Sequence, residues 1–384
     1  MDAGSAGGQL MASVSRNPKD PGWQARWRDP GGRQRKKNFA RKVEAQRWLD
    51  QMQAERHRGQ YVDPRAGKVR VGEVAEGWAR GLTHLKVSTA TRYRGLMRGH
   101  ILPRFGAWAI ADLRHSDVRD WVNDLSASGL SAGTVRQAHR VLSLILSEAV
   151  KDGRLARNVA AGVQLPRAVR ADPRFLNADE VTRLIAGAGT NGLSIAVLAF
   201  CGLRFGELAA LRVRRVNVLR RRLVVAESVT EVGGRLVWSL PKTNRTRTVP
   251  FPPSLTPQIE ALCQGKGPDD LLFTAPEGGT LRLGNWRRRA FDPACQAAGL
   301  VDVTPHDLRH TAASLAIASG ANVKAVQQML GHASAAMTLD VYAGLFGDDL
   351  DAVALALDGL VPPLRPFGAR SDGGEGQADP TDPA

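Results

Sequence analysis

Cysteine is scarce in this sequence. Only three occur in 384 residues, Cys201, Cys263 and Cys295, and no two of them form a Cys-x-x-Cys pair. An odd number of widely spaced cysteines argues against a disulfide framework and against a structural zinc site. We therefore expect a protein of a reducing compartment, the cytoplasm.

Long hydrophobic runs are also missing. The N-terminus has no apolar segment of the signal-peptide kind, and no run approaches the length of a membrane span, so no membrane association is expected. Acidic residues are outnumbered, 37 against 53 basic ones, which gives a formal net charge of +16. This balance favours a polyanionic partner, although a generally arginine-rich protein would show it too.

Residues 1–66 are predicted to form a small α+β module behind a disordered N-terminus. Apolar and polar residues alternate over 23–28 as in a strand, a turn and a second strand follow, and a helix is expected over 40–57. Such a sheet can lie in a DNA groove; the alternative is a solvated basic face. The expected DNA-binding residues are Arg26, Arg28, Arg33, Arg35, Lys36 and Lys37.

Residues 67–165 are predicted to form an all-α bundle of four helices, the second ending before Pro103. Arg136 and Arg140 on its last helix are candidates for phosphate contacts, or ordinary solvated residues.

A linker is expected over residues 166–174, a catalytic domain over 175–360 and a disordered tail over 361–384. The catalytic domain is predicted to be mainly helical, with a small β-meander over residues 222–250.

Arg204 is unusual for its position. It follows an apolar helix, where a partly buried guanidinium needs an anion. Glu207 can orient it in the free protein, and a phosphate could be its working partner. A purely structural Arg204–Glu207 pair is the alternative. Lys242 is expected at a hairpin tip, where most lysines have no function.

Thr304 is predicted to cap a helix whose first residue is Pro305, with Asp307 completing a capping box. His306 and Arg309 are three residues apart, so they share a face near a helix N-terminus, which favours an anion.

His310 is expected to face away from the surface that His306 and Arg309 share, with a structural role. A helix is expected to begin after Asn322 and to end at Gly331, which projects His332 from the helix end. Ser334 should cap the last short helix, which carries Tyr342. A tyrosine on such a helix is usually a core residue. Here the five other candidate residues of the site favour a functional role for Tyr342.

In chain order the candidates are Arg204, Lys242, His306, Arg309, His332 and Tyr342. Together with the stretches 202–207, 241–243, 306–310 and 330–342, this order resembles the tyrosine recombinases, specifically phage or integrative-element integrases. Residues 1–66 resemble their arm-type DNA-binding domain and residues 67–165 their core-binding domain. One departure is Gly344, where many relatives have a histidine.

The resemblance implies that Tyr342 attacks a DNA phosphodiester and forms a 3′-phosphotyrosyl link with a free 5′-hydroxyl. The bond energy is retained in this intermediate, so no cofactor is expected. A phenol has a pKa of about 10, so it needs a base or a cationic site. His306 is implied as the base, and Lys242 as the acid that protonates the leaving 5′-oxygen.

The resemblance also implies that Arg204 and Arg309 clamp the non-bridging phosphate oxygens, with His332 as a further donor. No acidic cluster suited to two metals occurs, so metal-free catalysis is expected.

The implied partners are double-stranded DNA with core and arm sites, other copies of this chain in a tetramer on DNA, a directionality factor and a host DNA-bending protein. The implied location is the nucleoid. The alternatives are a resolvase or dimer-resolving recombinase, a type IB topoisomerase, and a DNA-binding protein that has lost catalysis. The basic N-terminal module favours the integrase, and the complete set of six argues against lost catalysis.

Overall fold

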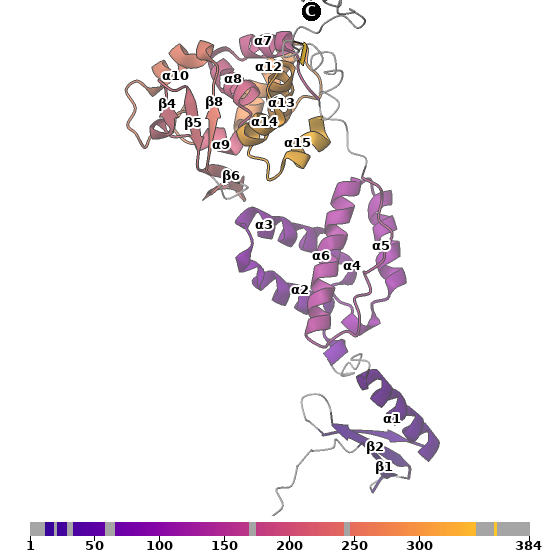
Figure 1. The fold of residues 1–384 in the computed structure, drawn as a ribbon. Coiled ribbons are helices and arrows are strands. Elements are labelled where there is room, and N and C mark those ends of the chain that lie inside the picture. Colours follow the sequence, from indigo (N-terminus) through magenta and orange to yellow (C-terminus); the bar gives the residue numbers. More distant parts are fainter. Residues whose placement is uncertain are drawn as a thin grey trace, which may run out of the picture. The chain divides into compact units, whose positions relative to one another are not determined.

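The computed structural model describes residues 12–18, 21–28, 34–57, 66–168, 174–241, 246–342 and 357–358 (Figure 1). By their contacts, the residues fall into two units. One comprises Met1–Asp172 with Val232–Val237, and the other Pro173–Glu231 with Trp238–Ala384.

A three-stranded antiparallel sheet with one helix forms the N-terminal module. The elements are β1 (Ser13–Arg16), β2 (Trp23–Arg28), β3 (Gln34–Phe39) and α1 (Lys42–His57), with the sheet order β1-β2-β3. Ala25 and Trp27 of β2 are buried with Ala45 and Leu49 of α1. Because side chains alternate along a strand, the arginines of β2 lie on the opposite face of the sheet.

The helical bundle is built around its longest helix. Its helices are α2 (Val71–Arg80), α3 (Val87–Leu96), α4 (Leu102–Phe105), α5 (His115–Ala127) and α6 (Ala132–Lys151). In α6, buried residues recur every three or four positions from Val135 to Ala149, which gives the helix a continuous apolar face.

A π-helical turn, Met97–Ile101, joins α3 to α4, so the chain stays helical past Pro103. The predicted helix end before this proline is therefore wrong. A widened turn can accommodate the proline ring and its missing N–H, which an undistorted α-helix cannot.

The second unit is mainly helical, as predicted. Its helices are α7 (Ala178–Gly187), α8 (Gly192–Cys201), α9 (Phe205–Ala209), α10 (Thr256–Cys263), α11 (Leu283–Trp286), α12 (Asp292–Ala297), α13 (Asp307–Ala318), α14 (Val323–Leu330) and α15 (Ala335–Tyr342). The apolar helix α8 is almost entirely buried and packs along α13, while α14 contacts α13, α15 and strand β8. In the described part of the chain, no helix has the length and apolarity to cross a membrane.

The strands that follow α9 lie in two small sheets, of which residues Val232–Val237 are grouped with the first unit. One has the order β4-β5-β8, formed by β4 (Val216–Asn217), β5 (Arg222–Val225) and β8 (Arg247–Pro250); β6 (Ser228–Val232) pairs with β7 (Arg235–Ser239) in the other. The expected single meander is thus divided, because β5 pairs with β8 across the intervening hairpin. Alternation along a sequence predicts strands, but it does not predict such a distant partner.

Helix α13 begins at Asp307, two residues later than predicted. The Asp307 carboxylate accepts hydrogen bonds from the backbone N–H and the hydroxyl of Thr304, both at 2.7 Å. The hydroxyl is therefore a donor here and does not cap the helix amides, so only half of the expected capping box forms. His306 lies in the turn just before the helix.

Candidate functional site

Two helix ends pack closely against each other in the second unit. Helices α8 and α14 both end in a left-handed glycine, Gly202 with φ 64° and Gly331 with φ 66°. A Cβ atom on Gly202 would lie 2.8 Å from a leucine methyl of α14, and one on Gly331 would lie 2.8 Å from Cδ of Arg247. Glycine is therefore required at both ends, for the turn and for the packing.

Arg309 of α13 joins these helix ends. It is 2% exposed, and its guanidinium donates hydrogen bonds to the carbonyl oxygens of Gly202 and Leu330. Burial lowers the pKa of Arg309 to about 9, and Arg204 acts in the same direction. The group therefore stays charged at pH 7. The charged guanidinium of Arg309 lies between the segment that carries Arg204 and the segment that carries His332.

The buried carboxylate of Glu207 holds two arginines. The Arg204 Nη1 atom lies 3.0 Å from Glu207 Oε1, and the Arg204 backbone N–H donates to Oε2. Arg247 approaches the same carboxylate with both Nη atoms, at 3.0 and 2.6 Å. Burial alone would raise the pKa of Glu207, but the hydrogen bonds and charge of Arg247, with those of Arg204, lower it.

Arg247 is a site residue that the sequence analysis missed. Besides Glu207, it contacts the end of α14, because its Nε donates to the Met329 carbonyl at 2.9 Å. The available signal was the strand period: Arg247 is two residues from the buried Val249 of β8 and so points inward with it. Arg247 thus connects the anchor of Arg204 to the helix end before His332.

Replacing Arg247 with Met should destabilise the fold by about 3 kcal/mol, because a buried carboxylate loses its bidentate partner. The lowered pKa of Glu207 contributes stability above its unfolded pKa, and this contribution is lost as the pH falls through the folded value. In the variant this loss should begin at a higher pH. Denaturant unfolding at pH 7 and pH 5 measures both effects.

The exposed Arg222 of the neighbouring strand supplies the control, and Arg222→Met should change stability little. Adding Glu207→Gln to Arg247→Met should restore part of the loss, because the buried carboxylate that lost its partner is then removed. Equal stability of Arg247→Met and wild type would contradict this arrangement.

Histidines and the candidate nucleophile form the other side of the site. The rings of His306 and His310 lie 4.9 Å apart and almost perpendicular. His310 Nδ1 lies 2.8 Å from the Tyr342 hydroxyl, so the prediction that His310 faces elsewhere is wrong. Tyr342 is 1% exposed and also packs against the ring of Phe175. Nδ1 of His332 lies 3.0 Å from the hydroxyl of a threonine in α15.

Burial sets the protonation of these groups. It lowers the pKa values of His306, His310 and His332, the last to about 4, and Arg309 acts in the same direction on all three. Burial raises the pKa of Tyr342 to about 12, which Arg309 opposes. At pH 7 the free protein therefore has neutral imidazoles beside a protonated, shielded phenol.

The predicted DNA-binding residues of the N-terminal module divide between two faces. Lys36 pairs with Arg26 across β2 and β3, so both lie on the face that α1 does not cover. Lys37 lies on the other face, with its Nζ 4.9 Å from the ring centroid of Trp48 in α1. By the same alternation, Arg28 belongs to the open face and Arg35 to the helix face.

Other predicted residues are placed as follows. Arg136 and Arg140 are exposed one turn apart on α6, and Arg136 donates to the carbonyl of Pro166 at 3.3 Å. Lys242 and Arg33 lie outside the described residues, so their roles stay predictions. Within the described part, no group of three or more His, Cys, Asp or Glu side chains is arranged to hold a metal ion.

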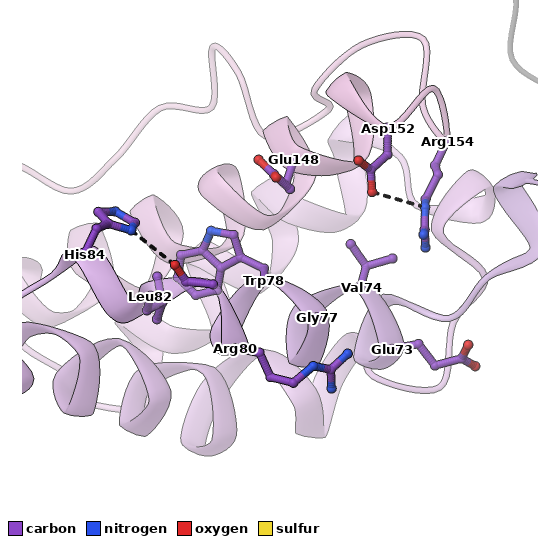
Figure 2. Close-up of a pocket in the computed structure, with 11 residues that line it drawn as sticks. Glu73, Val74, Gly77, Trp78, Arg80, Leu82, His84, Glu148, Asp152 and Arg154 are labelled. Atoms are coloured by element: carbon purple, nitrogen blue, oxygen red, sulfur yellow. Dashed lines mark hydrogen bonds and ion pairs between the residues drawn. The ribbon is translucent and has the colours of Figure 1, made fainter.

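A pocket of about 360 Å³ lies in the helical bundle, between α2 with the turn that follows it and the end of α6 (Figure 2). Its lining mixes charges, and Figure 2 shows the ion pair between Asp152 and Arg154, 3.4 Å long, together with Glu73 and Glu148. Carboxylates repel a phosphate backbone, and none of the six candidate catalytic residues lines this pocket.

Comparison with known proteins gives consistent matches. Residues 174–346 match the model of the phage integrase family, and residues 72–126 match that of the phage integrase N-terminal SAM-like domain. The chain is 29% identical to a protein of Mycobacterium tuberculosis named as the prophage phiRv2 integrase, over 87% of this chain and 92% of that protein. It is 30% identical to the tyrosine recombinase XerC of Mycobacterium bovis, over 58% of this chain and 76% of that protein.

Solved structures share the fold. The Tn1549 transposon integrase, in complex with a circular-intermediate DNA, matches 76% of this chain and 99% of its own with a TM-score of 0.66 and 20% identity. The lambda integrase, a tetramer bound to a Holliday junction, matches 84% of this chain and 95% of its own with a TM-score of 0.58 and 18% identity.

Proposed function

The chain belongs to the phage integrase family of tyrosine recombinases, and we propose that it cuts and rejoins DNA at specific sites with Tyr342 as its nucleophile. The observation that carries this assignment is the convergence of one tyrosine, two arginines and three histidines. They come from helices α13 and α15, the start of α9 and the end of α14. A phosphodiester bound beside Arg204 would lie next to Arg309 and Tyr342, which are buried in the free chain and must become accessible when DNA binds.

In the proposed reaction, the Tyr342 oxygen forms a bond to phosphorus and the bond to the 5′-oxygen breaks. The product is a 3′-phosphotyrosyl link, which a 5′-hydroxyl of another strand attacks in the second step. His306 is the proposed base for the phenol. Lys242 is the proposed acid for the leaving oxygen.

Arg204 and Arg309 are the proposed clamp for the non-bridging oxygens, whose negative charge grows in the transition state. The side chain of Arg204 is 25% exposed, so it can meet a phosphate while Glu207 holds it from the buried side. When the threonine hydroxyl of α15 donates to Nδ1 of His332, the ring proton lies on Nε2, which can then donate to phosphate.

Trapping on a suicide substrate tests this function. The full chain is mixed with a duplex of the attachment region that carries a nick on the 3′ side of the scissile phosphate. Cleavage then releases a short fragment with a 5′-hydroxyl, which diffuses away and cannot reverse the reaction. We expect protein–DNA complexes that survive denaturing electrophoresis. Binding without such complexes would favour the alternative of a DNA-binding protein that has lost catalysis.

We propose integration and excision of a phage or mobile element as the biological reaction, within the nucleoid of the cytoplasm. The match to a named prophage integrase covers more of this chain than the match to XerC does. The XerC likeness makes a dimer-resolving recombinase the second candidate. A plasmid assay with paired attachment sites separates them, because a resolvase needs no arm sites.

The proposed assembly is a tetramer on two DNA duplexes, with the bundle on core sites and the N-terminal module on arm sites. The tetrameric lambda integrase on a Holliday junction supports this proposal, since the two chains share a fold. A directionality factor and a host DNA-bending protein remain proposed partners.

The face of the sheet that α1 does not cover should carry the arm-site contacts. We expect the double variant Arg26→Gln, Lys36→Gln to weaken binding to attachment-region DNA and to lower the salt slope by about 2, one for each lost phosphate contact. Fluorescence anisotropy of the full chain over a range of salt concentrations measures this slope. Lys37→Gln on the helix face is the control, and an unchanged slope in the double variant would contradict the proposed face.

A further inference from the structure

His310 holds the hydroxyl of the proposed nucleophile. Its Nδ1 atom, 2.8 Å from the Tyr342 Oη atom, is the one hydrogen-bond partner of this hydroxyl among the described residues. His306, the proposed base, has no such bond to Tyr342 there; its ring instead meets the ring of His310 at a right angle. The hydroxyl that must lose its proton in the cleavage step therefore contacts a histidine that was expected to be only structural.

The direction of this hydrogen bond follows from the chemistry of the pair. A phenol has one proton to donate, and burial of Tyr342 leaves water little access to it. If the phenol donates to Nδ1, that proton is satisfied and the imidazole keeps its own proton on Nε2. The opposite direction would leave a buried phenol proton without a partner. The free protein thus has the lone pair of an imidazole aligned with the proton of the nucleophile.

We infer that His310 accepts the proton of Tyr342 when the phenol attacks the scissile phosphodiester. The O–H bond breaks, its electron pair forms the bond from Oη to phosphorus, and the proton goes to Nδ1 of His310. When a 5′-hydroxyl displaces the tyrosine in the second step, the imidazolium returns this proton to Oη. The inference rests on the proposed function and replaces only its choice of base.

His306 then acts differently. It is the more exposed of the two histidines and lies in the turn before α13. This position suits contact with the phosphate, through its ring N–H, better than contact with the buried phenol. The two imidazoles are neighbours because residues four apart on a helix share a face.

The pH dependence of cleavage tests the inference. The titratable and charged groups that surround the His310 ring are His306, Asp307, Arg309, His332 and Tyr342. Single-turnover cleavage of the suicide substrate should rise with pH as His310 becomes neutral and then level off. His310→Gln, which can accept the phenol hydrogen bond but cannot take the proton, should slow cleavage by about 100-fold and abolish this limb.

The matched variant is His306→Gln, which should slow cleavage but keep the limb. A second readout uses a fluorinated tyrosine at position 342, whose phenol has a lower pKa and needs a base less. It should rescue His310→Gln more than His306→Gln. A merely structural role for His310 would give no such selective rescue.

Several outcomes would overturn the inference. If His306 were the base, the rise of the cleavage rate with pH would vanish in His306→Gln and persist in His310→Gln. If His310 only restrained the tyrosine, cleavage would be unchanged or faster in His310→Gln. Absence of covalent complexes in the wild type would refute the proposed function itself. Nitrogen-15 spectra of histidine-labelled wild type are decisive even if a variant does not fold: Nδ1 of His310 must be unprotonated and must respond to Tyr342→Phe.

Discussion

Replacing Tyr342 with phenylalanine is expected to abolish covalent attachment to DNA and to leave DNA binding intact. The change removes the only atom proposed to attack phosphorus, so no slower route through the same residue remains. The ring still fills its place against Phe175, and the loss of one buried hydrogen bond to His310 costs about 1 kcal/mol of stability. Denaturing gels of the suicide-substrate reaction and binding shifts measure the two properties.

Tyr93 provides the matched control. It belongs to the helical bundle, where its ring stacks on Trp78 with centroids 6.0 Å apart. Tyr93→Phe keeps this stacking and should cleave at the wild-type rate. Covalent complexes formed by Tyr342→Phe would refute the assignment of the nucleophile.

Arg204→Ala should have the second-largest effect, a loss of about 3 kcal/mol of transition-state stabilisation, on the order of 100-fold in cleavage rate. The variant should fold normally, because Glu207 keeps its bidentate contact with Arg247. Arg309→Ala is a less clean test, since it also removes the donor that joins two helix ends. Single-turnover cleavage and thermal unfolding together separate chemistry from folding.

The exposed Arg183 of α7 serves as the control for lost positive charge. Arg183→Ala should leave cleavage unchanged. If Arg204→Ala cleaved at nearly the normal rate, the proposed clamp would be wrong. Arg204→Lys should recover little, because an ammonium lacks the fork that serves Glu207 and a phosphate at once.

The family could be identified from the sequence because its catalytic residues follow one another in a fixed order along the chain. That order can be read without knowing the fold. Sequence reasoning failed for His310, which was expected to face away from the surface that His306 and Arg309 share. Counted from His306, residue 310 is one helical turn further on and shares its face. The contact with Tyr342 also requires α15 to return to α13, and no local pattern predicts that packing.

Arg247 was missed for a related reason. Its partner Glu207 is 40 residues earlier, and the pairing of β5 with β8 that brings them together spans a hairpin. In the N-terminal sheet the predicted basic residues lie on strands as expected, apart from Arg33, which is outside the described residues. They were grouped without regard to alternation, which puts Lys36 and Lys37 on opposite faces.

The junction of the two glycine-terminated helix ends, with Arg309 between them and Arg247 beside them, has a consequence for engineering this protein. Residues that share partners do not contribute independently, so double-mutant cycles across this junction should give coupling energies of about 0.5–3 kcal/mol. Changes on the open face of the N-terminal sheet should be nearly additive. Libraries that seek new target sites should therefore vary the binding surfaces, since the effects of substitutions at the junction cannot be added from the single variants.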